Sequence, residues 1–115
     1  MSGAKQLVQK EIEDNFVMVF SKSYCPYCAA TKKLFSELEP TLEDGKTYKV
    51  IELDQRDDGS DIQNYIAQTY GQRTVPQVFI NGEFIGGNSD VQALKGKQLN
   101  EKLKAPKKTA AEHKA

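Results

Sequence analysis

The chain lacks tryptophan and has a single histidine and only two cysteines among its 115 residues. A structural zinc site takes about four Cys or His ligands, so two thiols and His113 are too few for one within the chain. His113 also lies in a polar segment near the C-terminus, which argues against a role as general base. In a reducing compartment, two cysteines indicate catalytic or metal-binding use rather than a permanent structural disulfide.

Net charge and long apolar runs are also missing. Acidic and basic side chains balance to a formal charge of zero, which argues against a broad electrostatic contact with nucleic acid. No segment approaches the roughly twenty apolar residues that a membrane-spanning helix needs, and residues 1–10 lack the apolar core of a signal peptide. We therefore expect a soluble, cytoplasmic protein with no membrane or nucleic-acid partner, other compartments being left open.

The length fits one small domain with one core. We place that domain at residues 1–104. Residues 105–115 form a basic tail that contains Lys107, Lys108 and Lys114 but no large apolar residue. Because such a segment has little apolar surface to bury, we expect the tail to be disordered.

Hydrophobic periodicity predicts an α/β fold. Apolar side chains recur at helical spacing in several segments, and short apolar runs mark strands. The hairpin signal Asn81-Gly82 joins the last two strands. The expected helices lie near residues 4–12, 30–38, 62–70, 88–94 and 99–103, and the expected strands at 16–20, 48–53, 78–80 and 83–85. This order predicts a four-stranded mixed sheet flanked by helices on both faces, with the first two strands parallel.

The motif Cys25-Pro26-Tyr27-Cys28 comes directly after the first strand and directly before a helix. The N-terminus of a helix favours negative charge, so a cysteine there is readily converted to a reactive thiolate. Taken alone, the motif leaves redox and metal-binding functions open.

Four separate motifs together resemble the dithiol glutaredoxins of the thioredoxin-fold superfamily, particularly the eukaryotic and fungal members. The motifs are Lys22-Ser23-Tyr24-Cys25-Pro26-Tyr27-Cys28, Thr74-Val75-Pro76, Ile80-Asn81-Gly82-Glu83-Phe84-Ile85 and Gly86-Gly87-Asn88-Ser89-Asp90. The resemblance covers residues 4–103. It implies a thioredoxin-like fold and a glutathione-dependent thiol–disulfide oxidoreductase that reduces protein–glutathione mixed disulfides and protein disulfides, with a role in electron transport and cell redox homeostasis.

The resemblance assigns different roles to the two cysteines. Cys25, at the helix N-terminus with Lys22 three residues upstream, is the expected nucleophile, with a pKa in the range of about 3.5–7.5 that activated thiols show. Cys28 lies one turn deeper and is the expected resolving thiol, which closes a Cys25–Cys28 redox disulfide.

The same resemblance implies a binding site for glutathione as co-substrate. A cis bond before Pro76 would expose the backbone of Val75 to the substrate, and the start of the next helix would hold the γ-glutamyl end. The expected contacts are Lys22, Tyr27, Gln63, Arg73, Thr74, Val75, Pro76, Gly87, Asn88, Ser89 and Asp90. Alternatives stay open for three of these: Gln63 as an ordinary helix residue, Arg73 as a surface cation and Asp90 as an early-helix residue that complements the dipole.

The expected partners are glutathione, glutathionylated or disulfide-containing proteins and, through glutathione, glutathione reductase. We expect a monomer without a metal.

Two other functions remain as alternatives. One is an iron–sulfur carrier shared between two chains, although its relatives usually have a small residue where this chain has Pro26. The other is a thioredoxin recycled by a flavin reductase, whose usual Trp-Cys-Gly-Pro-Cys motif is absent here.

Overall fold

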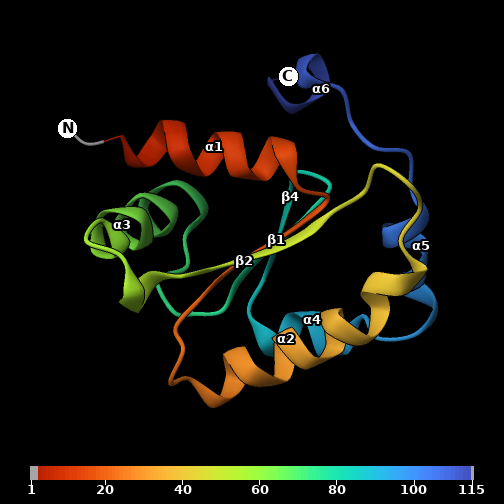
Figure 1. Cartoon of the computed structure of the whole chain (residues 1–115), viewed down its shortest axis with the longest axis horizontal. Helices are drawn as coiled ribbons and strands as arrows, with labels where there is room; N and C mark the ends of the chain where they lie inside the picture. Colours follow the sequence, from red (N-terminus) through yellow and green to blue (C-terminus); the bar gives the residue numbers. More distant parts are fainter. Residues whose placement is uncertain (1–2, 115) are drawn as a thin grey trace.

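Residues 16–20 are apolar at every position, as in a strand that is covered on both faces. In the computed structural model, which describes residues 3–114, this run forms most of β1 (Val17–Ser21), and every residue of β1 is buried. β1 is an inner strand of the sheet, so its C-terminal end delivers the following loop and the Cys25 motif to the middle of one sheet edge (Figure 1).

Four strands form one sheet in the order β2-β1-β3-β4. The remaining strands are β2 (Tyr48–Glu52), β3 (Gln77–Ile80) and β4 (Glu83–Gly86). β2 is parallel to β1, and β3 is antiparallel to both β1 and β4. The mixed four-stranded sheet predicted from the sequence is confirmed.

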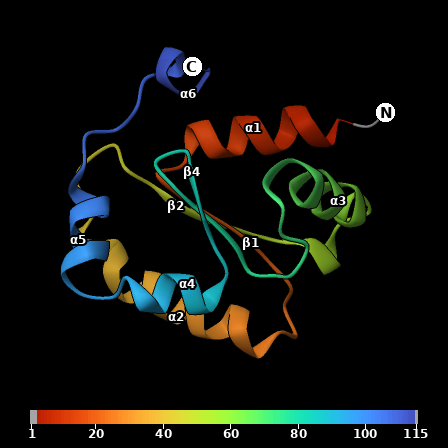
Figure 2. The ribbon, with the colours of Figure 1, turned by 180° about the vertical axis from the view of Figure 1, so that it is seen from behind.

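Helices cover both faces of this sheet, as the two views show (Figures 1 and 2). One face carries α1 (Ala4–Asp14) and α3 (Gly59–Tyr70), and the other carries α2 (Pro26–Leu38), α4 (Asn88–Ala93) and α5 (Lys97–Lys104). The short 3-10 helices η1 (Glu39–Thr41) and η2 (Leu53–Gln55) follow α2 and β2.

Side chains of β1 that point alternately to the two faces of the sheet divide the core into two layers. Met18 and Phe20 pack with α1 and α3, whereas Val17 and Val19 pack with α2, α4 and α5. Because successive side chains of a strand point to opposite faces, a single central strand anchors both layers. The layer that packs against α2 also includes Leu34 and Phe35 of that helix.

Turn residues occupy the positions that the sequence predicts. Gly71 ends α3 with φ 83°. Asn81 and Gly82 both have positive φ, of 51° and 82°, as a two-residue hairpin turn between right-twisted strands requires. The hairpin brings β4, and with it Gly86 and Gly87, back towards the loop that precedes β3.

Lys46 joins the loop before β2 to the end of α5. Its side chain is only 5% exposed, and its Nζ donates to the carbonyls of Leu103 at 3.0 Å and Ala105 at 2.8 Å. Nζ also lies 4.4 Å from the centre of the Phe16 ring. An ammonium here satisfies carbonyls that the end of a helix leaves without intrahelical partners.

The tail beyond α5 returns along the β3–β4 turn and ends in α6 (Ala110–Lys114). The side-chain amide of Asn81 donates to the Pro106 carbonyl at 3.0 Å, and its oxygen accepts the Lys108 N–H at 2.9 Å. Composition does not reveal these two contacts. The disorder expected for residues 105–115 stays a prediction, and residue 115 lies outside the described residues.

Candidate active site

Cys25 occupies the N-cap position of α2. Its backbone is extended (φ −88°, ψ 120°), Pro26 follows as the first helical residue, and Cys25 Sγ accepts the Cys28 N–H at 3.4 Å. Proline suits this position because its missing N–H would have no partner in the helix. The sequence thus places the first sulfur directly over the free N–H groups of a helix.

These surroundings set the protonation of Cys25. Burial by itself raises the pKa of this thiol. Hydrogen bonds from the Cys28 N–H, the Cys28 thiol and the Tyr27 N–H, together with the charge of Lys32, act in the opposite direction, and the net result is a pKa below the ordinary value. Cys25 is therefore the thiol that more readily becomes a thiolate.

Lys32 is a charged group that contributes to this lowered pKa. It follows Cys25 by seven residues, or about two helical turns. The backbone N–H of Lys22 donates to Cys28 Sγ at 3.5 Å. The charge of Lys22 also contributes to the lowered pKa of Asp54, after the larger effect of two hydrogen bonds from Ser23. The role of Lys22 beside Cys25 stays a prediction.

Cys28 has the opposite environment. It is fully buried, and burial raises the pKa of its thiol. Both cysteines are free thiols in the structure. The pair thus combines an accessible sulfur that favours the thiolate with a buried sulfur that favours the thiol, which is the asymmetry expected of a nucleophile and a resolving cysteine.

A groove opens beside Cys25. It has a volume of about 510 Å³. Its lining residues are Tyr27, Gln72, Thr74, Val75, Pro76, Gly87, Asn88, Ser89 and Asp90. All of them except Gln72 belong to the set predicted from the sequence. The groove therefore brings together the Thr-Val-Pro loop, the start of α4 and the exposed ring of Tyr27.

The Val75–Pro76 peptide bond is cis, as the sequence resemblance implied. Cys25 Sγ lies 4.0 Å from the carbonyl oxygen of Val75. The backbone of this loop therefore faces the reactive sulfur, where an extended substrate can pair with it.

Two glutamines fix the loop that lines the groove. Gln72 Nε2 donates to the carbonyls of Thr74 at 3.2 Å and Pro76 at 3.4 Å. Gln77 is fully buried, and its Nε2 donates to the carbonyls of Gln72 at 2.9 Å and Arg73 at 3.5 Å. Sequence reasoning missed both residues, because backbone-directed amides leave no periodic or motif signal.

Polar side chains also fix the start of α4. Asp90 Oδ2 accepts the Gly87 N–H at 2.9 Å, and Asn88 Oδ1 accepts the hydroxyl of the buried Thr31 at 2.8 Å. The N-cap of α4 is Gly87, and the side chain of Asn88 joins α4 to α2. A Cβ on Gly86, which has φ +121°, would lie 2.3 Å from Asp90 Oδ2. Glycine is therefore needed at position 86.

Gln63 and Arg73 do not line this groove. Gln63 Nε2 donates to the Arg73 carbonyl at 2.8 Å, and the Arg73 guanidinium donates to Asn64 Oδ1. The structure thus brings these two predicted residues to each other, at the junction of α3 and the loop.

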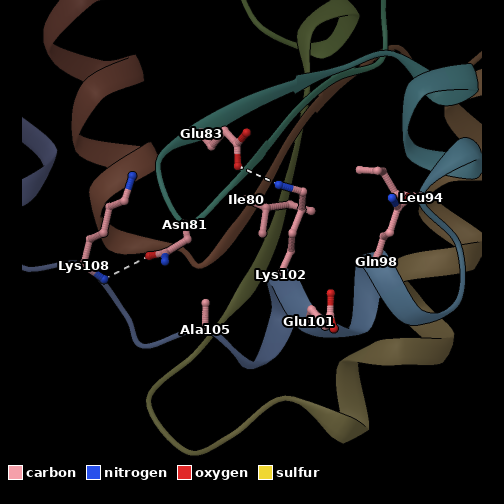
Figure 3. Close-up of a pocket in the computed structure, with 9 residues that line it drawn as sticks. All are labelled: Ile80, Asn81, Glu83, Leu94, Gln98, Glu101, Lys102, Ala105 and Lys108. Carbon is pink, nitrogen blue, oxygen red and sulfur yellow. Dashed lines mark hydrogen bonds and ion pairs between the residues drawn. The ribbon is translucent and has the colours of Figure 1, made fainter.

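A larger cavity, of about 580 Å³, lies elsewhere, between the β3–β4 turn and α5 (Figure 3). Its walls include Ile80, Leu94 and the ion pair between Glu83 and Lys102, whose Oε1 and Nζ are 3.0 Å apart. Its lining shares no residue with the groove beside Cys25. Size alone does not identify the reactive site in this molecule.

Two features are absent from residues 3–114. No helix in this range is long and apolar enough to cross a bilayer. The same range holds no cluster of three or more His, Cys, Asp or Glu side chains arranged to bind a metal ion.

Comparison with known proteins gives consistent matches. The family model described as Glutaredoxin matches residues 17–85. Glutaredoxin-C6 of Oryza sativa subsp. japonica is 55% identical over 78 residues, which are 68% of this chain and 64% of that protein. Glutaredoxin-2 of Schizosaccharomyces pombe is 45% identical over 92 residues, 80% of this chain and 78% of that protein.

Solved structures agree with these matches. The crystal structure of a buckwheat glutaredoxin–glutathione complex is 44% identical in sequence, with a TM-score of 0.77, and the match covers 87% of this chain and 86% of that one. The crystal structure of a wheat glutaredoxin gives a TM-score of 0.78 at 46% identity, and the match covers 90% of this chain and 95% of that one.

Proposed function

Because this chain belongs to the glutaredoxin family of glutathione-dependent thiol–disulfide oxidoreductases, we propose that it reduces protein–glutathione mixed disulfides and protein disulfides, with Cys25 as the nucleophile. The observation that carries the proposal is the contrast between the two thiols. The pKa of Cys25 is lowered and that of the fully buried Cys28 is raised.

In the proposed reaction, the Cys25 thiolate attacks the glutathione sulfur of a mixed disulfide. A new S–S bond forms between Cys25 and glutathione, and the protein substrate leaves as a thiolate that takes up a proton. A second glutathione then attacks the Cys25 adduct and leaves as glutathione disulfide. With protein disulfides, Cys28 attacks the mixed disulfide at Cys25 and releases the substrate thiol, which closes the Cys25–Cys28 bond.

The groove beside Cys25 is the proposed site for glutathione. The buckwheat relative was solved as a glutathione complex. In this chain, the Val75 backbone would pair with the peptide part of the ligand, and Ser89 and Asp90 would meet its γ-glutamyl end. Lys22, Gln63 and Arg73 remain candidates for the glycine carboxylate, for which Gln63 and Arg73 would have to exchange their present partners for the ligand.

Two serine variants test the roles of the cysteines. We expect Cys25→Ser to abolish all activity, because no other thiol of low pKa is present. We expect Cys28→Ser to retain substantial deglutathionylation and to lose most protein-disulfide reduction. Loss of deglutathionylation in the Cys28→Ser protein would refute these roles.

A coupled assay tests the choice of reductant. We propose that the oxidised protein is recycled by glutathione, and glutathione in turn by glutathione reductase, with the protein acting as a cytoplasmic monomer. Turnover should follow NADPH oxidation when glutathione and glutathione reductase are supplied. Equal turnover with thioredoxin reductase alone would contradict the proposal.

A further inference from the structure

Side-chain amides hold the carbonyl groups of the loop that precedes β3. Gln72 Nε2 donates to the carbonyls of Thr74 at 3.2 Å and Pro76 at 3.4 Å. Gln77 Nε2 in turn donates to the backbone carbonyl of Gln72 at 2.9 Å. Gln72 and Gln77 together are called the amide clamp below. The clamp joins the interior of the protein to the loop that lines the groove.

Val75 is the residue of this loop that the clamp leaves open. Within residues 3–114, no side-chain amide donates to the Val75 carbonyl, which faces Cys25 Sγ at a distance of 4.0 Å. The carbonyls that Gln72 holds belong to the residues on either side of Val75. The clamp therefore occupies the neighbouring acceptors and leaves the acceptor beside the reactive sulfur available to a ligand.

The Thr74 carbonyl also determines where the Val75 N–H points. Both groups belong to one planar peptide unit, and in a trans peptide they point in opposite directions. The cis bond of the loop is the next one, Val75–Pro76. With the Thr74 carbonyl bound to Gln72, the Val75 N–H points away from that amide. The Pro76 carbonyl, bound to the same amide, fixes the chain on the other side of Val75. One side chain thus sets the direction of both backbone groups of Val75.

Gln77 supports Gln72 from the interior. It is fully buried at the start of β3, where it is the register partner of Phe20 on β1. Its Nε2 faces the carbonyls of Gln72 and Arg73, while its Oε1 has no hydrogen-bond partner within residues 3–114. The opposite orientation would place an oxygen against two carbonyl oxygens, so the donors of this amide face the loop.

The unpaired oxygen of Gln77 indicates a purpose other than stability. A buried acceptor without a partner destabilises the fold, and an apolar side chain of similar size would avoid this loss. Residues that lower stability in this way are expected where function depends on them. For Gln77, the groups that gain from its presence are the loop carbonyls that its Nε2 binds.

The Gln72 amide also lies against the opposite wall of the groove. Gln72 lines the groove together with Gly87, Ser89 and Asp90, and a Cβ built on Gly87 would lie 3.2 Å from Gln72 Nε2. The absence of a side chain at Gly87 lets the N-cap of α4 approach the amide this closely. The clamp thus holds Val75 at a set distance from the start of α4.

Building on the proposed function, we propose that the amide clamp gives the protein a preference for glutathione over disulfides that lack a peptide group. Gln72 and Gln77 are positioning residues, which act through the backbone of Val75. A ligand with peptide groups can pair with Val75 without having to order the loop first. A disulfide without peptide groups meets the same Cys25 thiolate but gains nothing from the clamp.

The test compares two oxidants in the Cys28→Ser background, in which Cys25 is the reacting thiol. Glutathione disulfide has peptide groups, and bis(2-hydroxyethyl) disulfide has none. With either oxidant, the Cys25 thiolate attacks one sulfur, a mixed disulfide forms at Cys25, and the other half leaves as a thiolate. Acid quenching and mass spectrometry give the two second-order rate constants, and their ratio measures the preference for glutathione. Alkylation by iodoacetamide measures the reactivity of Cys25 alone.

Gln72→Met and Gln77→Met remove the amide donors with little change in volume. The net effect of one hydrogen bond is roughly 2- to 12-fold in an equilibrium constant, so we expect the preference to fall at least about threefold in each variant and further in the double variant. The rates with bis(2-hydroxyethyl) disulfide and iodoacetamide should stay close to those of the parent Cys28→Ser protein. Gln72 is only half-buried, so Gln72→Met tests the clamp even if Gln77→Met folds poorly.

Gln9→Met is the matched control. Gln9 is also a half-buried glutamine whose Nε2 makes two hydrogen bonds, to the hydroxyls of Tyr65 at 2.8 Å and Tyr70 at 3.1 Å. This variant should lose similar stability in urea and keep the full preference. The clamp is overturned if Gln72→Met and Gln77→Met keep the preference, if both oxidants slow equally, or if Gln9→Met loses the preference too. A parent protein with no preference would refute the proposed function together with the clamp.

Discussion

At the scale of single residues, Lys32 acts on the nucleophile. Its charge helps to lower the pKa of Cys25, and its Nζ pairs with Glu52 Oε2 at 2.8 Å. The ion pair with Glu52 joins α2 to β2. A neutral residue at position 32 is expected to raise the pKa of Cys25.

Lys32→Gln in the Cys28→Ser background should raise the pKa of Cys25, because the thiolate loses a stabilising positive charge. A thiol of lowered pKa loses its thiolate as the pH falls through that pKa, so alkylation by iodoacetamide should decline at a higher pH in the variant. The measurement is the alkylation rate against pH. Lys33→Gln, at the neighbouring exposed position, is the control, and coinciding pH profiles for all three proteins would contradict the prediction.

Sequence and structure agree at the residues that belong to a compact motif. Cys25 and Cys28 were found from their spacing, and the Thr74-Val75-Pro76 loop from resemblance. The hydrogen bond from Ser21 Oγ to Glu52 Oε1, at 2.7 Å, could not be predicted, because it depends on the register between β1 and β2, which the pattern of apolar residues along one strand does not specify.

At the scale of elements, the distance between α2 and α4 determines whether the nucleophile and the groove meet. The buried Thr31 of α2 reaches Asn88 of α4, and Gln92 Nε2 donates to the same Asn88 oxygen at 3.2 Å. Asparagine is often found as a helix N-cap, whereas here Gly87 is the N-cap and Asn88 is the first residue of α4. The long-range partner on α2 uses that side chain differently, and local preference could not reveal this.

Thr31→Val removes the hydroxyl while keeping the shape of the side chain. We expect a loss of about 1 kcal/mol in the free energy of unfolding, as for one buried hydrogen bond. The KM for a glutathionylated substrate should rise severalfold, because the start of α4 is held less firmly. Steady-state kinetics and urea denaturation measure the two effects. Thr69→Val, on the exposed side of α3, should change neither, and an unchanged KM in Thr31→Val would disprove the role.

At the scale of the whole molecule, the far end of the fold is held together by polar contacts. The buried ammonium of Lys46 binds the carbonyls at the end of α5, and Asn81 binds the backbone of the following tail. The layered fold could be predicted from periodicity, because each layer depends on repeated apolar residues. The position of the tail could not, since it depends on single amides and one lysine.

Lys46→Met should destabilise the protein by about 1–3 kcal/mol, because the part-buried carbonyls of Leu103 and Ala105 lose their donor. Activity per folded molecule should be unchanged, since Lys46 lies far along the chain from the groove and lines no part of it. Chemical denaturation measures the loss of stability. The kcat/KM, measured at a temperature where the variant is fully folded, tests the activity. A variant as stable as the parent, or one that folds fully but is inactive, would contradict the expectation.

The position of α6 has a practical consequence. In both views α6 lies across the molecule from the start of α2 (Figures 1 and 2), while Tyr24 and Tyr27 beside Cys25 are 72% and 68% exposed. A linker attached after the last residue would therefore leave the reactive sulfur facing outward. The protein can be immobilised through its C-terminal end on an electrode or a bead, with Cys25 accessible to substrates in solution.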